Sequence, residues 1–446
     1  MRPRSVLLLL LASTVDAGCA SRAPSSAGAL ATTATAGPTI ALVNGQWYTG
    51  SGFARRTLYM IGGVLLTRRP SRVDSTIDLA NGYVIPPFGD AHTHNLDGTF
   101  NLDKVRGAYV AEGTFYVQVL TNAATNAAQV RDRWNRACDL DVLYANGGIT
   151  STLSHPFLAY EPRAMGLYGE WAPHAAAIRT SRLREGNAYW FIDDLAALDA
   201  TWPRILAARP GVLKIFLLDA MEQPPAMPDS GLPHGHGLRP SLVPEIVRRA
   251  HAANLRVAAH VETAADFAIA VDAGVDIMAH LPGYGFGNDP DGRARLGGST
   301  AAFEIPETVA RKAGQRRIVV TPTVSWTLGG SGPDSAAAVV VRQALMKRNI
   351  DRLTSAGVRF VVGSDWFGST ATHEITDMRA ARVWDDATLL HMWAVETPQS
   401  IFPGRKIARF DDGYEASFLV LDQNPVSDFN AVKSIRLRVK QGCPVS

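Results

Sequence analysis

The middle of the chain alternates short apolar runs with longer amphipathic stretches, and this rhythm constrains the fold more than any other feature. Two of the stretches, 244–253 and 264–273, have the length and pattern of helices. Apolar runs between such helices are typical of a buried parallel sheet. Eight β-like segments over about three hundred residues predict a (β/α)8 TIM barrel, an α/β fold. The segments are 84–85, where the first strand is expected to end, then 114–120, 148–153, 212–218, 255–259, 275–279, 318–321 and 358–362.

The two ends of the chain are also rich in β-like runs, but these are separated by Asn-Gly and Gly-Gly turn signals. We expect the ends to pair with each other. A chain of 446 residues with 46% hydrophobic residues is long enough for a barrel and a second small domain. The predicted division is a composite β-sandwich domain from 39–84 plus 395–446, and a barrel from 85–394.

The N-terminus has the order of a secretory signal peptide. Arg2 and Arg4 precede an apolar run at 6–12, and small residues follow up to Cys19. This predicts a signal peptide at 1–18, a flexible Ser/Ala/Thr/Gly/Pro tether at 19–38, and export. Residues 17–19 resemble the end of a bacterial lipoprotein signal, although Asp16 departs from that pattern. The expected location is therefore the bacterial periplasm or, through a lipidated Cys19, a membrane tether in the cell envelope.

Charge and cysteine content exclude several classes of protein. Lys plus Arg number 44 and Asp plus Glu number 41, which gives 44 − 41 = +3, and no basic cluster marks a nucleic-acid surface. Cys19, Cys138 and Cys443 form neither a disulfide framework nor a Cys-x-x-Cys pair. The sequence leaves open whether Cys138 and Cys443 are free, and whether the chain forms a homo-oligomer.

Residues of metal-ligand type follow or interrupt the predicted strands. In a (β/α)8 barrel the active site lies where the strands end, so such residues are expected to meet there. His92 and His94 are two positions apart and therefore point the same way along a strand, toward one metal. A single His in such a place is more often a hydrogen-bonded core residue, but several in register with an Asp favour a metal site. The candidate ligands are His92, His94, Lys214, His260, His280 and Asp365.

A second His-x-His pair, His234 and His236, serves as a comparison. It follows no strand and lies in a Gly/Pro-rich stretch. We interpret it as a surface or rim loop.

Together these motifs resemble the amidohydrolase superfamily, and most closely its imidazolonepropionase-like and Xaa-Pro-dipeptidase-like branch. The resemblance covers nearly all of the chain after residue 38. It is carried by Asp-x-His-x-His at 90–94, a Lys on the fourth strand, His-Val-Glu-Thr at 260–263, His-Leu-Pro-Gly at 280–283 and Gly-Ser-Asp at 363–365.

The resemblance implies two divalent metal ions and a lysine carboxylated by CO2. His92, His94 and Asp365 would hold one metal, His260 and His280 the other, and carboxylated Lys214 both. The ions bring +4, and a carbamate, Asp365 and a bridging hydroxide bring −3, which leaves about +1 for the surroundings to screen. An ammonium at Lys214 would raise the sum to about +3, so Lys214 is either carboxylated or displaced from the metals. Zinc suits these ligands, and Mn, Co, Ni or Fe would also fit.

The implied activity is hydrolysis of an amide-type C–N bond in a small-molecule substrate. A metal-bound hydroxide would attack the carbonyl, and Asp365 would carry the proton to the leaving nitrogen. Candidate substrates are a dipeptide, an N-acyl amino acid, a cyclic amide or a carbamate. Candidate substrate-binding residues follow the strands, although aromatics there can equally pack loop against loop. They are His155, Tyr284, Trp326 and Trp366 with its neighbour Phe367.

Three other functions remain open from the sequence. A mononuclear deaminase would use much the same His and Asp residues but would not need Lys214, and would release ammonia with one metal bound. Hydrolysis of a phosphotriester or a lactone shares the binuclear centre. A non-catalytic envelope binding protein would keep the fold without turnover.

Overall fold

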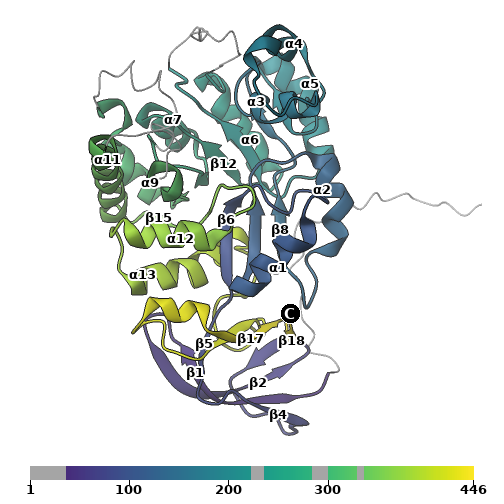
Figure 1. Ribbon diagram of the computed structural model, residues 1–446, viewed down its shortest axis with the longest axis vertical. Coiled ribbons are helices and arrows are strands. Elements are labelled where there is room, and N and C mark those ends of the chain that lie inside the picture. Colours follow the sequence, from purple (N-terminus) through teal and green to yellow (C-terminus); the bar gives the residue numbers. More distant parts are fainter. Residues whose placement is uncertain (1–36, 222–235, 284–299, 329–335) are drawn as a thin grey trace, which may run out of the picture. The chain divides into compact units, whose positions relative to one another are not determined.

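The computed structural model describes residues 37–221, 236–283, 300–328 and 336–446 (Figure 1). The expected signal peptide, all of the expected tether up to residue 36, and Cys19, His234 and Tyr284 lie outside these residues. Within the described ranges, no helix combines the length and apolar character needed to cross a membrane.

Segments from both ends of the chain form one eight-stranded sheet. Its order is β18-β17-β16-β5-β1-β2-β3, with β4 paired to β1. The antiparallel pairing of β16 with β5 brings the two ends together, with Val420 opposite Val84. The strands are β1 (Ile40–Tyr48), β2 (Phe53–Ile61), β3 (Val64–Leu66), β4 (Ser75–Asp78), β5 (Tyr83–Ile85), β16 (Phe418–Leu421), β17 (Ile435–Lys440) and β18 (Cys443–Pro444).

The prediction misplaces the first parallel strand, and it misses two others at Asp141–Tyr144 and Tyr189–Phe191. Val84 and Ile85 belong to β5 of this sheet and not to the first parallel strand, which is β6 (Phe88–Thr93). Pro86 and Pro87 separate the two strands because proline has no N–H for a sheet ladder. His92 therefore lies within the first parallel strand, and His94 immediately follows it.

The remaining strands form two parallel sheets. One has the order β10-β9-β11-β12-β13-β14-β15, and the other β6-β7-β8. Each of the other predicted runs contains a strand, so the prediction of an α/β fold with parallel strands is confirmed. The strands are β7 (Thr114–Val119), β8 (Asp141–Tyr144), β9 (Gly148–Thr150), β10 (Tyr189–Phe191), β11 (Leu213–Phe216), β12 (Val257–His260), β13 (Ile277–Met278), β14 (Val319–Val320) and β15 (Arg359–Phe360).

Helices follow most of these strands and lie around the parallel sheets (Figure 1). Two of them fall where the pattern predicts, and one of these begins at a capping box between Thr263 and Asp266. The helices are α1 (Leu102–Glu112), α2 (Ala124–Val130), α3 (Phe157–Ala164), α4 (Ala175–Thr180), α5 (Leu195–Ala207), α6 (Val243–Ala252), α7 (Ala264–Ala273), α9 (Glu307–Gln315), α10 (Val324–Leu328), α11 (Ala336–Ser355), α12 (Ala371–Ala380), α13 (Asp386–His391) and α14 (Thr397–Ile401). Short 3-10 turns span Arg131–Arg133, Ala172–His174, Pro240–Leu242, Ala301–Phe303 and Phe429–Lys433, and a π-helical turn spans Met392–Glu396.

The C-terminal strands are tied to the parallel strands by a disulfide and a buried ion pair. Cys138 and Cys443 are bonded across 305 residues of sequence, with their Cα atoms 5.1 Å apart. Beside them, Lys440 Nζ lies 3.0 Å from Asp141 Oδ1. The state of these two cysteines, which the sequence leaves open, is therefore a disulfide.

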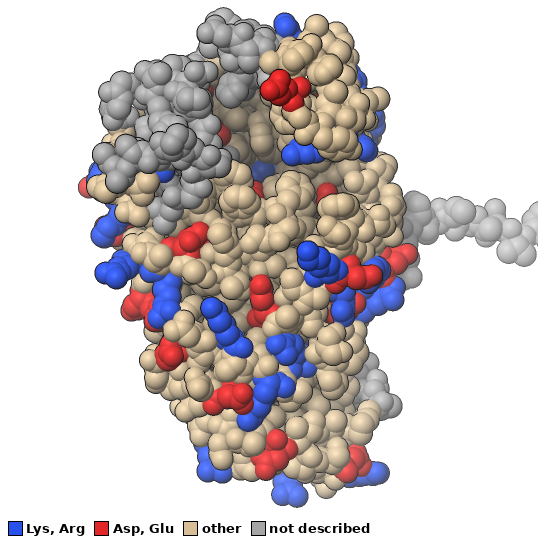
Figure 2. All heavy atoms as spheres, in the orientation of Figure 1, with Lys and Arg blue, Asp and Glu red and all other residues tan. Residues whose placement is uncertain are grey.

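Acidic and basic side chains are mixed on the face of the molecule that Figure 2 shows. Neither sign of charge dominates this face among the described residues. This distribution gives no support to a nucleic-acid surface.

Candidate metal centre

The six predicted ligands line one cavity of about 620 Å³. They come from positions far apart in the sequence and meet because each lies on or just after a parallel strand. This is the edge at which ligands bind in parallel α/β sheets. The cavity-lining ligand candidates are His92, His94, Lys214, His260, His280 and Asp365.

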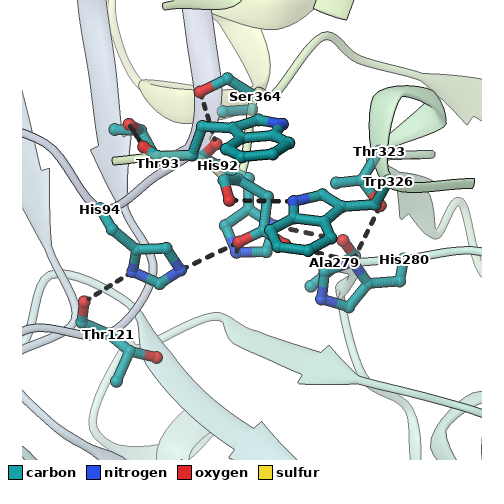
Figure 3. A network of polar contacts seen from close by, with 12 residues as sticks. His92, Thr93, His94, Thr121, Ala279, His280, Thr323, Trp326 and Ser364 are labelled. Atoms are coloured by element: carbon teal, nitrogen blue, oxygen red, sulfur yellow. Dashed lines mark hydrogen bonds and ion pairs between the residues drawn. The ribbon is translucent and has the colours of Figure 1, made fainter. Parts of the chain in front are cut away.

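His92, His94 and Asp365 form the tightest group. The Nε2 atoms of His92 and His94 lie 3.1 and 2.9 Å from Asp365 Oδ1. One ligand atom from each residue falls within 4.8 Å of the others, close enough to hold one metal ion. The other ring nitrogens, both Nδ1, lie 3.2 Å from the carbonyl oxygens of Ala279 and Thr121 (Figure 3). These carbonyls accept a hydrogen bond from Nδ1–H, which directs each Nε2 toward Asp365 and the proposed metal.

A buried carboxylate holds this group in register. Asp90 accepts hydrogen bonds from Ser364 Oγ and Tyr109 Oη, both at 2.9 Å, and burial raises its pKa to about 7. It therefore joins strand β6 to the loop that carries Asp365. Gly363 lets that loop come close, because a Cβ there would stand 2.6 Å from the His92 nitrogen. The sequence contains Asp90 in the metal motif but gives no sign of this role.

His260 and His280 continue the row of imidazoles. The ring centroid of His280 lies 5.0 Å from that of His92 and 4.7 Å from that of His260. His280 Nδ1 is 2.9 Å from Thr323 Oγ1, and His260 Nε2 is 3.1 Å from Glu262 Oε1. The four imidazoles are thus close enough to serve neighbouring metal ions.

Lys214 is the unusual member of the set. Its side chain on β11 is 1% exposed, and its Nζ has no hydrogen-bond partner in the described structure. Burial lowers its pKa to about 7, although the charge of Asp365 acts in the opposite direction. A buried amine without a partner costs free energy, so this position calls for a group that the protein chain itself does not supply. A carbamate on Nζ that binds metal ions fits this requirement.

Burial also keeps most of the imidazoles neutral, the form that binds metal. It lowers the pKa of His92 to about 4 and those of His260 and His280 well below the usual value. At His94 burial acts in the same direction but is outweighed by the hydrogen bond to Asp365, so its pKa is raised. The pKa of Asp365 is held well below its usual range, because the neighbouring histidines outweigh the effect of burial. Asp365 is therefore an anion.

Three of the four predicted substrate-binding residues also line the cavity. His155 stacks on His260 with ring centroids 5.0 Å apart, and Trp326 stacks on Trp366 at 4.6 Å. Trp326 Nε1 donates to the Asp365 carbonyl at 3.0 Å, so this indole also fixes the loop that carries the carboxylate. Phe367 lines the cavity and stacks on His94 at 5.2 Å.

The cavity wall contains polar residues that the sequence reasoning missed. Arg163 and Tyr160 lie on α3, and Asp219 and Glu262 follow strands β11 and β12. For the two carboxylates, their position just after a predicted strand was a signal that could have found them. For Arg163 the signal is helical spacing, which can be used only once the limits of α3 are known.

The second His-x-His pair gives a contrast. His236 is buried, so the expectation of a surface or rim loop is wrong for this residue, and its Nδ1 lies 3.0 Å from the Asp219 carbonyl. Unlike His92 and His94, it does not line the cavity.

Solved structures of similar fold include several hydrolases. An amidohydrolase matches at a TM-score of 0.66 and 18% identity, over 91% of this chain and 98% of that one. The chain has the fold of an amidohydrolase. A Xaa-Pro dipeptidase with bound methionine matches at 0.66 and 15% over 92% and 100% of the two chains. An ochratoxinase from A. niger matches at 0.65 and 16% over 92% and 96%. No protein-family model and no curated protein matches the sequence.

At these identities the likeness establishes the amidohydrolase fold, and the site must be argued from its own residues.

Proposed function

We propose that this protein is a metal-dependent hydrolase that cleaves an amide-type C–N bond in a small molecule. The observation that carries the proposal is Lys214, a buried amine without a partner that shares one cavity with four imidazoles and a carboxylate. The site also holds Asp365 as an anion and most of its imidazoles as neutral ligands. These are the protonation states that a metal centre requires.

The centre that we propose is binuclear. His92, His94 and Asp365 would hold one metal, His260 and His280 the other, and Lys214, carboxylated by CO2, both. Zinc suits this mixture of nitrogen and oxygen ligands, with Mn, Co, Ni or Fe as alternatives. When bound, the ions would supply a hydroxide nucleophile near neutral pH and polarise the scissile carbonyl.

The protein side chains would then orient the substrate and move the proton. Asp365 accepts the proton of the attacking water at a carboxylate oxygen and delivers it to the leaving nitrogen. The aromatic rings of Trp326, Trp366 and Phe367 give one side of the cavity an apolar lining. His155 packs on His260 and keeps that ring in place.

The amide class of substrate is supported by the fold. The solved structures of the same fold include a prolidase complexed with N-methylphosphonate-L-proline, a Xaa-Pro dipeptidase and a molinate hydrolase. We propose a dipeptide, an N-acyl amino acid or a cyclic amide for this chain.

For the architecture, we propose a closed barrel at 85–394 and a β-sandwich built from 39–84 and 395–446. Hydrogen bonds already cross between the parallel sheets at two places. Ala91 N donates to the Val362 carbonyl at 2.8 Å, and Gly211 N donates to the Tyr144 carbonyl at 2.8 Å.

For the location, we propose export to the periplasm, with Cys19 as a lipidation site and membrane tether. The Cys138–Cys443 disulfide supports export, because disulfides persist in oxidising compartments.

The function is tested by loading the purified full chain with zinc, manganese or cobalt in the presence of bicarbonate. Dipeptides, N-acyl amino acids, cyclic amides and aminated heterocycles are then assayed for hydrolysis. We expect two metals per chain and cleavage of an amide. One metal and ammonia release from a heterocycle would favour a deaminase, and no turnover with two metals bound would contradict an enzymatic role.

A further inference from the structure

One face of helix α3 forms a wall of the cavity. Pro156, Ala159, Tyr160 and Arg163 line it, at the i, i+3, i+4 and i+7 spacing of one helical face. The wall starts at the candidate metal ligands, because His155, one residue earlier, stacks on His260.

Arg163 is the cation of this wall. Its side chain lines the cavity but is exposed to solvent, and no described carboxylate pairs with it. Its Nη1 donates to the Ala159 carbonyl of its own helix at 2.5 Å. Arg405 elsewhere shows how an arginine of this protein is satisfied when its role is structural. It pairs with Asp141 and Glu415, both at 2.7 Å.

The carboxylate nearest to Arg163 in sequence is already engaged. Glu161 is fully buried, outside the cavity-lining set, and accepts hydrogen bonds from Ser181 Oγ and the Arg184 nitrogen. Tyr189 Oη donates to the same carboxylate. Glu161 therefore anchors the end of α3 and leaves Arg163 available to a ligand.

The position of Arg163 suits a group close to the scissile bond. Seven residues separate it from Pro156, which is about 10 Å along a helix axis. A long side chain on a helix points back toward the N-terminus, here toward His155 and the metal site. A guanidinium is the group best matched to a planar carboxylate, because its N–H groups can bind both oxygens.

We propose that Arg163 binds a carboxylate of the substrate, so that the protein acts on amides that carry a free carboxylate, as N-acyl amino acids and dipeptides do. This inference rests on the proposed function and narrows it, since neutral cyclic amides and carbamates lack the group that Arg163 would bind. The aromatic rings of Trp326, Trp366 and Phe367 remain for the apolar part of the same substrate.

The test uses the metal-loaded full chain and a panel of N-acyl amino acids and dipeptides, each paired with its C-terminal carboxamide. Release of the acyl acid or of the N-terminal amino acid reports cleavage of the same bond in both members of a pair. We expect the free acids to be cleaved at least about 10-fold more efficiently than the carboxamides.

Arg163→Gln is expected to lower kcat/KM for the acids about 100-fold, mainly through KM, and to leave the carboxamides unchanged. Arg163→Lys should restore part of the loss. Arg239→Gln, at an exposed arginine outside the cavity lining, is the matched control and should change neither series. Calorimetric binding of the product amino acid to the metal-loaded protein should weaken in Arg163→Gln only.

The outcomes separate this inference from the proposed function. Carboxamides cleaved as fast as acids, or a preference for acids that survives in Arg163→Gln, would overturn the role of Arg163 and leave the hydrolase intact. Cleavage of no member of the panel would overturn the role of Arg163, and if protein with two bound metals also fails to cleave the cyclic amides, both are overturned.

Discussion

Two fully buried lysines occupy very different surroundings in this protein. Lys440 Nζ, on β17, donates to Asp141 Oδ1 at 3.0 Å and to the Arg136 carbonyl at 2.9 Å. Lys214 Nζ, on β11, has no hydrogen-bond partner in the described structure. Burial lowers the pKa of both, but at Lys440 the charge of Asp141 opposes it directly through an ion pair.

We propose that this difference separates a structural lysine from a functional one. Lys440 joins the C-terminal strands to β8, and its charge is balanced by the chain itself. Lys214 Nζ lies 5.3 Å from the centroid of the Phe216 ring, and the charge of Asp365 opposes the effect of burial on its pKa without an ion pair. Under the proposed function, carboxylation and metal ions complete these surroundings. Exposure alone, 1% for Lys214 and 0% for Lys440, does not distinguish them.

The largest effect is expected for Lys214→Met. The substitution removes the group that would bridge the metals, so we expect loss of at least one metal per chain and a fall in kcat of about 10³-fold or more. The metal-free variant should be at least as stable as the metal-free wild type, because an unpaired buried amine is lost and the volume is kept. Metal analysis, turnover and urea unfolding measure the three quantities. Full turnover with two metals bound would remove Lys214 from the site.

The matched substitution Lys440→Met should have the opposite profile. It leaves Asp141 buried with Arg405 as its remaining partner, so we expect a loss of about 3 kcal/mol in the free energy of unfolding. Metal content and kcat of the folded protein should stay at the wild-type level. An equal loss of metal from both methionine variants would erase the distinction between the two lysines.

The Cys138–Cys443 disulfide belongs to the same structural region as Lys440, because Cys443 lies opposite Lys440 in the antiparallel pairing of β17 with β18. Cys443→Ser should destabilise the protein by about 2–3 kcal/mol, without changing kcat, by releasing the long loop to Cys138. A reductant should lower the unfolding midpoint of the wild type and not that of the variant. A midpoint that reductant does not move in the wild type would show that the bond is absent.

Glu374 is a buried carboxylate that is hydrogen-bonded to backbone N–H groups, and it provides an acidic counterpart to the two buried lysines. Glu374, on α12, accepts from the nitrogens of Val324 and Ser325 at 2.7 and 2.9 Å, and burial raises its pKa to about 8. The folded state then holds a proton that the unfolded state releases near pH 4.5. Protonated Glu374 makes its full contribution to stability below pH 4.5. This contribution is lost as the pH rises toward about 8, and the free energy of unfolding then falls by at most about 1.4 kcal/mol per pH unit.

Glu374→Gln should flatten this slope in urea unfolding of the metal-free protein. Glu245→Gln is the control, because hydrogen bonds from Arg248 and Arg249 hold the pKa of half-buried Glu245 at about 2, below the pH range over which Glu374 acts. An unchanged slope in Glu374→Gln would show that Glu374 is ionised in the folded state.

The sequence predicts the candidate metal ligands of the cavity better than the other residues that line it. His260, His280 and Asp365 could be placed because each lies at or shortly after the end of an apolar parallel strand, and strand ends meet by topology. Lys214 could be placed because it interrupts the apolar run that forms β11. The lack of a partner for its amine is a property of the folded core and cannot be read from the sequence.

The parts that were missed depend on contacts between distant or helical residues. Arg163 lines the cavity because of the face of α3 on which it lies. Cys138 and Cys443 are 305 residues apart in the sequence and meet only in the folded protein. The misplaced first strand has a local cause, since Val84 and Ile85 read as a strand whichever sheet they join. Only the Pro86–Pro87 break decides that they pair with the C-terminal β16.

The central claim is that the Lys214 amine becomes a carbamate that metal ions hold in place. Carbon NMR of metal-loaded protein prepared with ¹³C-bicarbonate tests it directly, with Lys214→Met and Lys440→Met as comparisons. The account predicts one carbamate resonance in the wild type and in Lys440→Met, and none in Lys214→Met. A metal-loaded, active wild-type protein without that resonance, or a resonance that persists in Lys214→Met, would contradict it.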